Sequence, residues 1–155
     1  MPHIHKLIDF TVGAFIVHKH KVLLVSHRKL KQWLPVGGHI ELDEDLEEAL
    51  FREIREESGL KRNDITIVGK KNAIYDSEGR KALFNPIFTD IHRISRRHRH
   101  IGFGYVIKAK TDKVALAERE HHAIKWFTKS ELSSQKYKIN PGIRYYAKEA
   151  LRLAK

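Results

Sequence analysis

Three glutamates stand close together in the segment FREIREESGL (51–60), at Glu53, Glu56 and Glu57. Carboxylates three and four positions apart on a helix repel each other, and partial burial raises their pKa values further. A hard divalent cation relieves this conflict, and Mg²⁺ prefers oxygen ligands while it keeps several waters. If the three side chains face the interior, their spacing favours a magnesium site that also takes phosphate oxygens of a substrate.

The sequence predicts that a helix over about 44–58, capped by Asp43, carries these glutamates. A helix turns by about 100° per residue, and the apolar residues then share one face, which must be the buried one: Leu46, Ala49, Leu50 and Ile54. Glu53 and Glu57 project along the middle of this face, and Glu56 lies on its flank. The three carboxylates therefore continue the apolar face of the helix instead of its polar face.

Strands surround this helix in the sequence pattern. Apolar and β-branched runs predict strands at 10–19, 21–27, 64–76, 100–110 and 122–127, and Pro35, Gly37 and Gly38 predict an irregular loop over 30–41. A last helix begins at Pro141, with Asn140 as its cap. Strands on both sides of a central helix, followed by a terminal helix, predict a mixed sheet covered on two faces.

The central segment GHIELDEDLEEALFREIREESGL (38–60) resembles the Nudix box at each of its nine specified positions over 23 residues. The flanks agree, because WLPVGG (33–38) is similar to the lead-in to the box and IKWFTKSEL (124–132) to a late strand and helical turn of the family. The resemblance implies an α/β fold, a Nudix-type sandwich of a mixed β-sheet between helices. We expect one Nudix hydrolase domain over residues 1–155.

The resemblance also implies Mg²⁺-dependent hydrolysis of a nucleoside diphosphate linked to another group, with Mn²⁺ as a substitute ion. The catalytic and metal-binding residues that it implies are Glu53, Glu56, Glu57 and Arg52. In some members the glutamate at the position of Glu53 is also the general base. Arg52 would hold a carboxylate in place, and Glu44 would support the site from behind. Gly38 would abut the metal, where a side chain would obstruct the phosphates.

Four residues outside the helix are further candidates. Glu120 lies before the last predicted strand, where some Nudix enzymes supply another catalytic glutamate, but the charged stretch AEREHH is equally typical of a solvated loop. Arg28 and Lys31 precede the box and are candidates for binding an anionic substrate. Trp33 is a candidate for stacking on a base, although an aromatic residue at such a position is more often part of the core.

The histidines raise the question of a zinc site, since there are 11 of them. His98 and His100 would share one face of a strand. The sequence offers no further ligand beside them at a recognised zinc spacing, so we expect solvated or phosphate-contacting histidines. The basic cluster RISRRHRH (93–100) is a candidate for contacting substrate phosphates or RNA, although charge runs of this kind are usually solvated.

Composition limits the alternatives. The chain of 155 residues, 41% of them hydrophobic, suits one domain, and no apolar run approaches the roughly 20 residues needed to cross a bilayer. The absence of cysteine excludes disulfides, thiolate zinc sites and cysteine nucleophiles. The first ten residues lack the pattern of a signal peptide, and we expect a cytoplasmic protein without a membrane partner.

The charge leaves three functions open. Lys and Arg number 30 against 19 Asp and Glu, a net charge of +11 that attracts anionic partners. The leading hypothesis is hydrolysis of a small anionic nucleotide. The alternatives are a pyrophosphohydrolase that acts on the 5′ end of RNA, and a non-catalytic Nudix-fold regulator that binds a nucleotide. The presence of all three glutamates disfavours the regulator. The sequence does not predict the leaving group or an oligomeric state.

Overall fold

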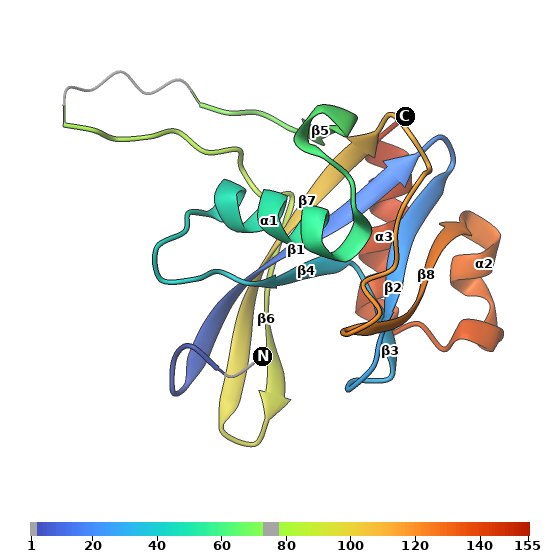
Figure 1. Cartoon of the computed structure of the whole chain (residues 1–155). Helices are drawn as coiled ribbons and strands as arrows, with labels where there is room; N and C mark the ends of the chain where they lie inside the picture. The colour runs from blue at the N-terminus through green and yellow to red at the C-terminus, as the bar shows by residue number, and fades with distance from the viewer. Residues whose placement is uncertain (1–2, 73–77) are drawn as a thin grey trace.

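The computed structural model describes residues 3–72 and 78–155. Eight strands form one mixed sheet, in the order β3-β2-β1-β7-β5, with β4 paired to β1, β6 to β7 and β8 to β2 (Figure 1). The strands are β1 (Ile8–His18), β2 (Lys21–His27), β3 (Gln32–Leu34), β4 (Val36–His39), β5 (Ile65–Val68), β6 (Phe88–Ser95), β7 (His98–Ala109) and β8 (His121–Thr128). The helices are α1 (Leu46–Ser58), α2 (Lys129–Ser133) and α3 (Pro141–Leu153). The predicted mixed sheet between helices is confirmed.

The sheet separates two hydrophobic cores. Strands β1 and β7 run parallel through its centre, whereas the other pairs are antiparallel. Successive side chains of β1 alternate between the faces, so Val12 and Ile16 join the core under α1 while Phe15 and Val17 join the core under α3. Figure 1 shows α1 and α3 on opposite sides of the sheet, with α2 beside β8. Helix α1 is thereby held against β1 and β4.

Helix α1 begins later than its sequence pattern predicted. Asp45, and not Asp43, is the N-cap: its side chain accepts hydrogen bonds from the backbone of Glu47 and Glu48, and Glu48 completes a capping box. Gly59 ends the helix in the left-handed conformation with φ 72°, which costs glycine little because it has no Cβ. The predicted apolar face is confirmed, since Ala49, Leu50 and Ile54 are fully buried.

Three strand predictions were wrong in part. The loop predicted over 30–41 contains the short strands β3 and β4, which pair with β2 and β1. Of the strand predicted over 64–76, the structure shows β5 (Ile65–Val68), and residues 73–76 lie outside the described residues. Strand β6 was missed because nearly all of its residues are exposed, so its sequence has no apolar alternation. Within the described ranges, no helix is long and apolar enough to span a membrane.

Candidate active site

Two of the three glutamates, Glu53 and Glu57, face β4 and not the solvent. Glu53 and Glu57 are 2% and 4% exposed, respectively. Glu57 is held by the backbone of β4, because the N–H of Gly37 donates to its Oε2 atom at 2.9 Å. The Glu56 side chain, on the flank of the helix, remains 50% exposed. The structure therefore brings two carboxylates into the interior and leaves the third at the edge, as the helical spacing predicted.

Arg52 is the cation that organises this group. Its guanidinium donates to both carboxylate oxygens of Glu44, at 2.5 and 2.8 Å, and to the backbone carbonyl of His39 at 3.0 Å. A further donor, Nη1, lies 2.8 Å from Glu53 Oε1 and 3.4 Å from Glu56 Oε2. The two-pronged bond to Arg52 lowers the pKa of Glu44. Arg52 thus links the entry to α1, the end of β4 and two of the three glutamates.

Gly38 provides the space that Glu53 occupies. A Cβ atom built at Gly38 would lie 2.6 Å from Glu53 Cδ and closer still to its Oε1 atom. No side chain can therefore be present at this position while Glu53 keeps its place. The backbone of β4 and the carboxylate of α1 are in direct contact here, and this contact defines one wall of the site.

The three glutamates Glu53, Glu56 and Glu57 carry more negative charge than the single guanidinium of Arg52 neutralises. Burial, assisted by the charges of Glu57 and Glu56, raises the pKa of Glu53 to about 7, and the Arg52 guanidinium limits the rise. Two buried carboxylates and a third at the edge form a donor set of hard oxygens. This set fits a divalent cation such as Mg²⁺, whose charge would remove the repulsion.

The loop before β8 and the first residue of β8 bring two more side chains, Glu120 and His121, to Glu57. His121 Nε2 lies 2.8 Å from Glu57 Oε1, and His121 is 1% exposed. The ligand atoms of Glu57, Glu120 and His121 all lie within 4.8 Å of one another. The structure thus places Glu120, a candidate from the sequence, beside the glutamates of α1. His121 was not predicted, because its neighbours in the sequence are charged and give no sign that β8 buries it.

The comparisons with known proteins agree with this geometry. The NUDIX domain family matches residues 8–149, which is nearly the whole chain. The chain belongs to the Nudix family. The crystal structure of a NUDIX-family hydrolase from Clostridium perfringens superimposes with a TM-score of 0.81 and 38% identity, over 95% of this chain and 98% of that one.

Two curated relatives of this Nudix chain are matched over part of their length. One is the m7GpppN-mRNA hydrolase NUDT17 of Xenopus laevis, 34% identical over 65 residues, which are 38% of this chain and 22% of the relative. The other is a probable DHNTP pyrophosphohydrolase of Lactococcus lactis, 24% identical over 111 residues, or 72% of this chain and 60% of the relative. In both cases the match spans less than two thirds of the relative.

The three substrate-binding candidates of the Nudix chain lie in different places. Arg28 is hydrogen-bonded to the loop before β8. Its side-chain Nε donates to the carbonyl of Glu118 at 2.7 Å, and its backbone N–H donates to the carbonyl of Glu120 at 3.0 Å. Lys31 is exposed in the turn that follows β2. Trp33 packs edge-on against Phe127, with ring centroids 4.9 Å apart, beside the core under α3. The structure does not bring Trp33 together with the glutamates.

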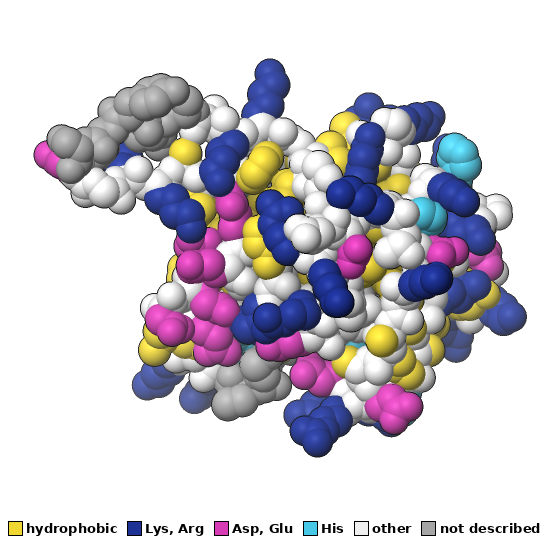
Figure 2. All heavy atoms as spheres, turned by 45° about the horizontal axis from the view of Figure 1, so that its top comes forward, with side chains coloured by type: hydrophobic (Ala, Val, Ile, Leu, Met, Phe, Trp, Pro, Cys, Tyr) yellow, Lys and Arg dark blue, Asp and Glu magenta, His cyan; other side chains and the backbone are white. Residues whose placement is uncertain are grey.

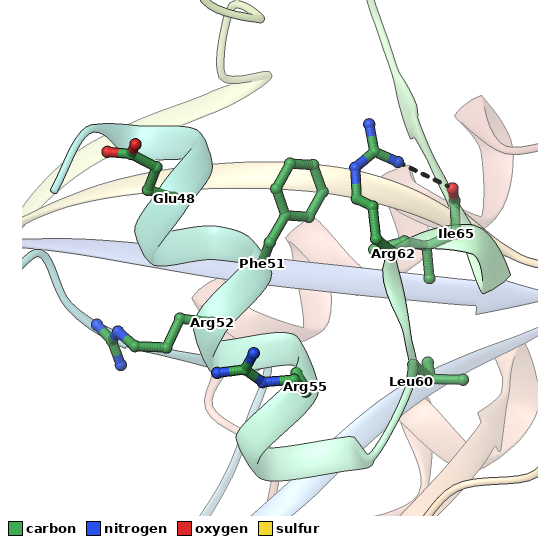
Figure 3. A pocket seen from close by; sticks show the side chains of 7 residues that line it. All are labelled: Glu48, Phe51, Arg52, Arg55, Leu60, Arg62 and Ile65. Atoms are coloured by element: carbon green, nitrogen blue, oxygen red, sulfur yellow. Dashed lines mark hydrogen bonds between the residues drawn. The ribbon is translucent and has the colours of Figure 1, made fainter.

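A pocket lies on the outer face of α1 (Figure 3). Its lining consists of Glu48, Phe51, Arg52, Arg55, Leu60, Arg62 and Ile65. The Arg62 guanidinium covers the Phe51 ring at 4.2 Å from the centroid, which leaves this face of the ring unavailable to a base. At about 100° per residue, Glu53 and Glu57 point to the opposite side of α1. Glu53 and Glu57 therefore do not line this pocket, and Arg52 is the residue that borders both the pocket and the glutamates.

Proposed function

We propose that this chain is a divalent-metal-dependent pyrophosphohydrolase that cleaves a phosphoanhydride bond in a small nucleotide. The observation that carries the proposal is the packing of Glu53 and Glu57 against the glycines of β4, with Glu56 at the open edge. Buried carboxylates without matching cations are costly in a purely structural helix. A substrate that brings phosphates together with a metal ion turns the same charge into a binding site.

Glu53, Glu56 and Glu57 would hold Mg²⁺, with Mn²⁺ as a substitute, beside the backbone of Gly38. When bound, the ion stabilises charge on phosphoryl oxygens and lowers the pKa of the attacking water. Arg52 orients the Glu53 carboxylate, and Glu44 keeps Arg52 in place by its two-pronged contact. These bonds position the oxygens of Glu53 before the substrate arrives.

The proton of the water requires a base. Glu53 is one candidate, because burial raises the pKa of its carboxyl group to about 7 in the metal-free protein and it lies within the proposed metal site. Glu120 is the second candidate, because it approaches Glu57 from the loop before β8. We propose that Arg28 holds this loop and that Lys31 attracts the phosphates of the substrate. A cytoplasmic location and a single domain over the whole chain remain predictions.

The relatives support a nucleotide substrate. The Lactococcus lactis relative is named as a probable DHNTP pyrophosphohydrolase, and the Xenopus laevis relative as an mRNA hydrolase. We favour the small nucleotide because the basic side chains are dispersed: Figure 2 shows Lys and Arg spread over the visible face, without a continuous stripe. Binding of a long polyanion usually requires such a stripe.

The test is a Mg²⁺-dependent screen over nucleoside triphosphates, nucleotide sugars, dinucleoside polyphosphates and 5′-triphosphate RNA. On the best substrate, Glu53→Gln and Glu57→Gln should each lower kcat by at least about 10²-fold, because both remove a metal-binding charge and keep the shape. Glu120→Gln should give a smaller loss. Glu118→Gln is the matched control, an exposed glutamate of the same loop, and should act like the wild type. Wild-type turnover by Glu57→Gln would contradict the proposal.

The net charge of +11 motivates a second candidate, hydrolysis at the 5′ end of RNA. Many phosphate contacts would make RNA binding weaken log-linearly with salt, whereas a small nucleotide would depend modestly on salt and strongly on Mg²⁺. We expect the second pattern. Measuring triphosphate RNA and free nucleoside triphosphate side by side, up to physiological salt, decides between them. Tight RNA binding at physiological salt, with faster turnover than the free nucleotide, would favour the RNA enzyme.

A further inference from the structure

A second group of ionisable side chains lies away from the glutamates of α1. Asp9 is on β1, His98 and His100 are on β7, His39 ends β4, and His3 precedes β1. In the parallel pair of β1 and β7, Asp9 is directly opposite His100. The prediction that His98 is solvated is wrong, because His98 is 4% exposed and Asp9 is fully buried. This group, the histidine–aspartate cluster, has no role in the proposed hydrolysis.

The cluster converges on one carboxylate oxygen. Asp9 Oδ2 lies 3.2 Å from His3 Nδ1, 3.2 Å from His98 Nε2 and 3.1 Å from His39 Nε2. The ligand atoms of His3, Asp9, His98 and His100 all lie within 4.8 Å of one another. Four ligands placed tetrahedrally at 2.0–2.2 Å from a zinc ion lie about 3.3–3.6 Å apart. The distances from Asp9 to His3 and to His98 are close to this spacing, and His100 lies within 4.8 Å of the other ligand atoms.

The hydrogen bonds of the cluster leave nitrogens without a partner. Within the described part of the chain, the Nε2 atoms of His39, His98 and His100 are buried and make no hydrogen bond. The other nitrogen of His98, Nδ1, lies 3.3 Å from the carbonyl of Lys6. A neutral His98 that donates there presents the lone pair of Nε2 to the Asp9 carboxylate. A metal ion bound by both of these atoms, which lie 3.2 Å apart, would satisfy them together.

The surroundings of the ligands are those of a metal site. A ligating histidine commonly donates its second ring N–H to a backbone carbonyl, as His98 does toward Lys6. The carboxylate of Asp9 is fixed by the backbone N–H of His5 at 2.6 Å and that of Ile4 at 3.2 Å.

We propose that His3, Asp9, His98 and His100 bind one Zn²⁺ ion. Three imidazoles and a carboxylate suit zinc and are poor ligands for Mg²⁺, which prefers oxygen alone. Four protein ligands leave no open position, so the site is structural and not catalytic. The ion ties the segment before β1 to β7.

The zinc site is connected to the glutamates through β4. The ring of His39 contacts Asp9, while its backbone carbonyl accepts a hydrogen bond from Arg52. Strand β4 also carries the glycines that pack against Glu53 and Glu57. Zinc at the cluster would therefore stiffen the strand on which the carboxylates rest.

The test uses the full chain with Glu57→Gln, so that the three glutamates of α1 (Glu53, Glu56 and Glu57) contribute less to metal binding. After treatment with EDTA, the protein is titrated with Zn²⁺ and, separately, with Co²⁺. We expect one equivalent of Zn²⁺ to bind and to raise Tm, and Co²⁺ to give the intense visible bands of tetrahedral coordination. His98→Gln should lower the affinity for Zn²⁺ about 10²-fold or more. His20→Gln, an exposed histidine in the turn after β1, is the matched control and should bind like the parent.

Far-UV circular dichroism shows whether each variant is folded. If His98→Gln fails to fold, His3→Gln decides the matter, because the exposed His3 can be replaced without disturbing a core. A folded His3→Gln with lowered Zn²⁺ affinity supports the site. A parent protein that binds no Zn²⁺, or unchanged Zn²⁺ affinity in His3→Gln, would overturn it, whatever the outcome for hydrolysis.

Discussion

Replacing Gly38 by alanine adds one methyl group where β4 faces the Glu53 carboxylate. The new Cβ would lie 2.6 Å from Glu53 Cδ, and ordinary contact begins at 3.4 Å. Glu53 must therefore retreat by at least 3.4 − 2.6 = 0.8 Å. The backbone of Gly38 is not in the left-handed region, so alanine meets no conformational penalty there. The whole effect of the substitution acts through the carboxylate.

A displacement of about 1 Å at a reacting group can cost about 10²-fold in rate, and we expect kcat of Gly38→Ala to fall by this factor. Overpacking a buried site destabilises by about 1–3 kcal/mol, part of which is offset because alanine restricts the unfolded chain. The net loss in the free energy of unfolding should be about 1–2 kcal/mol. The protein should stay folded while its turnover collapses.

The assay measures kcat in saturating Mg²⁺ on the best substrate of the screen, together with Tm. Gly13→Ala is the matched control: it lies on the neighbouring strand β1, and its new Cβ would meet only Pro35 Cγ at 3.5 Å, an ordinary contact. We expect wild-type kcat for Gly13→Ala. Wild-type kcat for Gly38→Ala would refute the argument that Glu53 needs this space. Equal losses in both variants would assign the effect to general strain in the sheet.

Three further predictions concern stability. Gly59→Ala should lower the free energy of unfolding by about 1 kcal/mol, because alanine is strained at φ 72°; an unchanged urea midpoint would contradict this. Asn140→Ala removes the cap that accepts the N–H of Gly142 and should cost about 1 kcal/mol, measured in the same way, with no change in kcat. The backbone N–H of Thr128 and a nearby lysine lower the pKa of Glu131 to about 2 from 4.5. Its stabilising contribution is thus present above pH 4.5 and lost as the pH falls toward 2, and Glu131→Gln should flatten Tm across this window.

The elements of the Nudix box follow from local sequence. A single helix carries the glutamates, so the helical step alone predicted that Glu53 and Glu57 point inward and that Glu56 lies on the flank. The end of α1 at Gly59 is likewise predictable locally, because glycine adopts the left-handed conformation at low cost. The cap was misplaced because three acidic residues precede the helix, and only the hydrogen bonds show that Asp45 accepts the free backbone N–H groups.

The contacts made across the sheet were not predictable in this way. His121 meets Glu57, and His98 meets Asp9, because segments far apart in the sequence come together in the fold, and a single sequence contains no record of which segments do so. Strand β4 is too short for an apolar pattern and was therefore taken for a loop. The role of Trp33 was left open by the sequence, since both a base-stacking and a core aromatic residue are apolar.

The parallel pairing of β1 with β7 determines when the site can exist during folding. The Oγ1 atom of Thr11 donates to the carbonyl of Ile101, 90 residues further along the chain. Contacts of such sequence separation form late, because a long loop must close before they stabilise anything. On a ribosome, α1 would be complete long before β7 emerges, so its glutamates would spend this interval in water with ordinary proton affinity. We expect the affinity for divalent cations to appear only in the last stage of folding, and nascent chains that end before Ala109 to lack it.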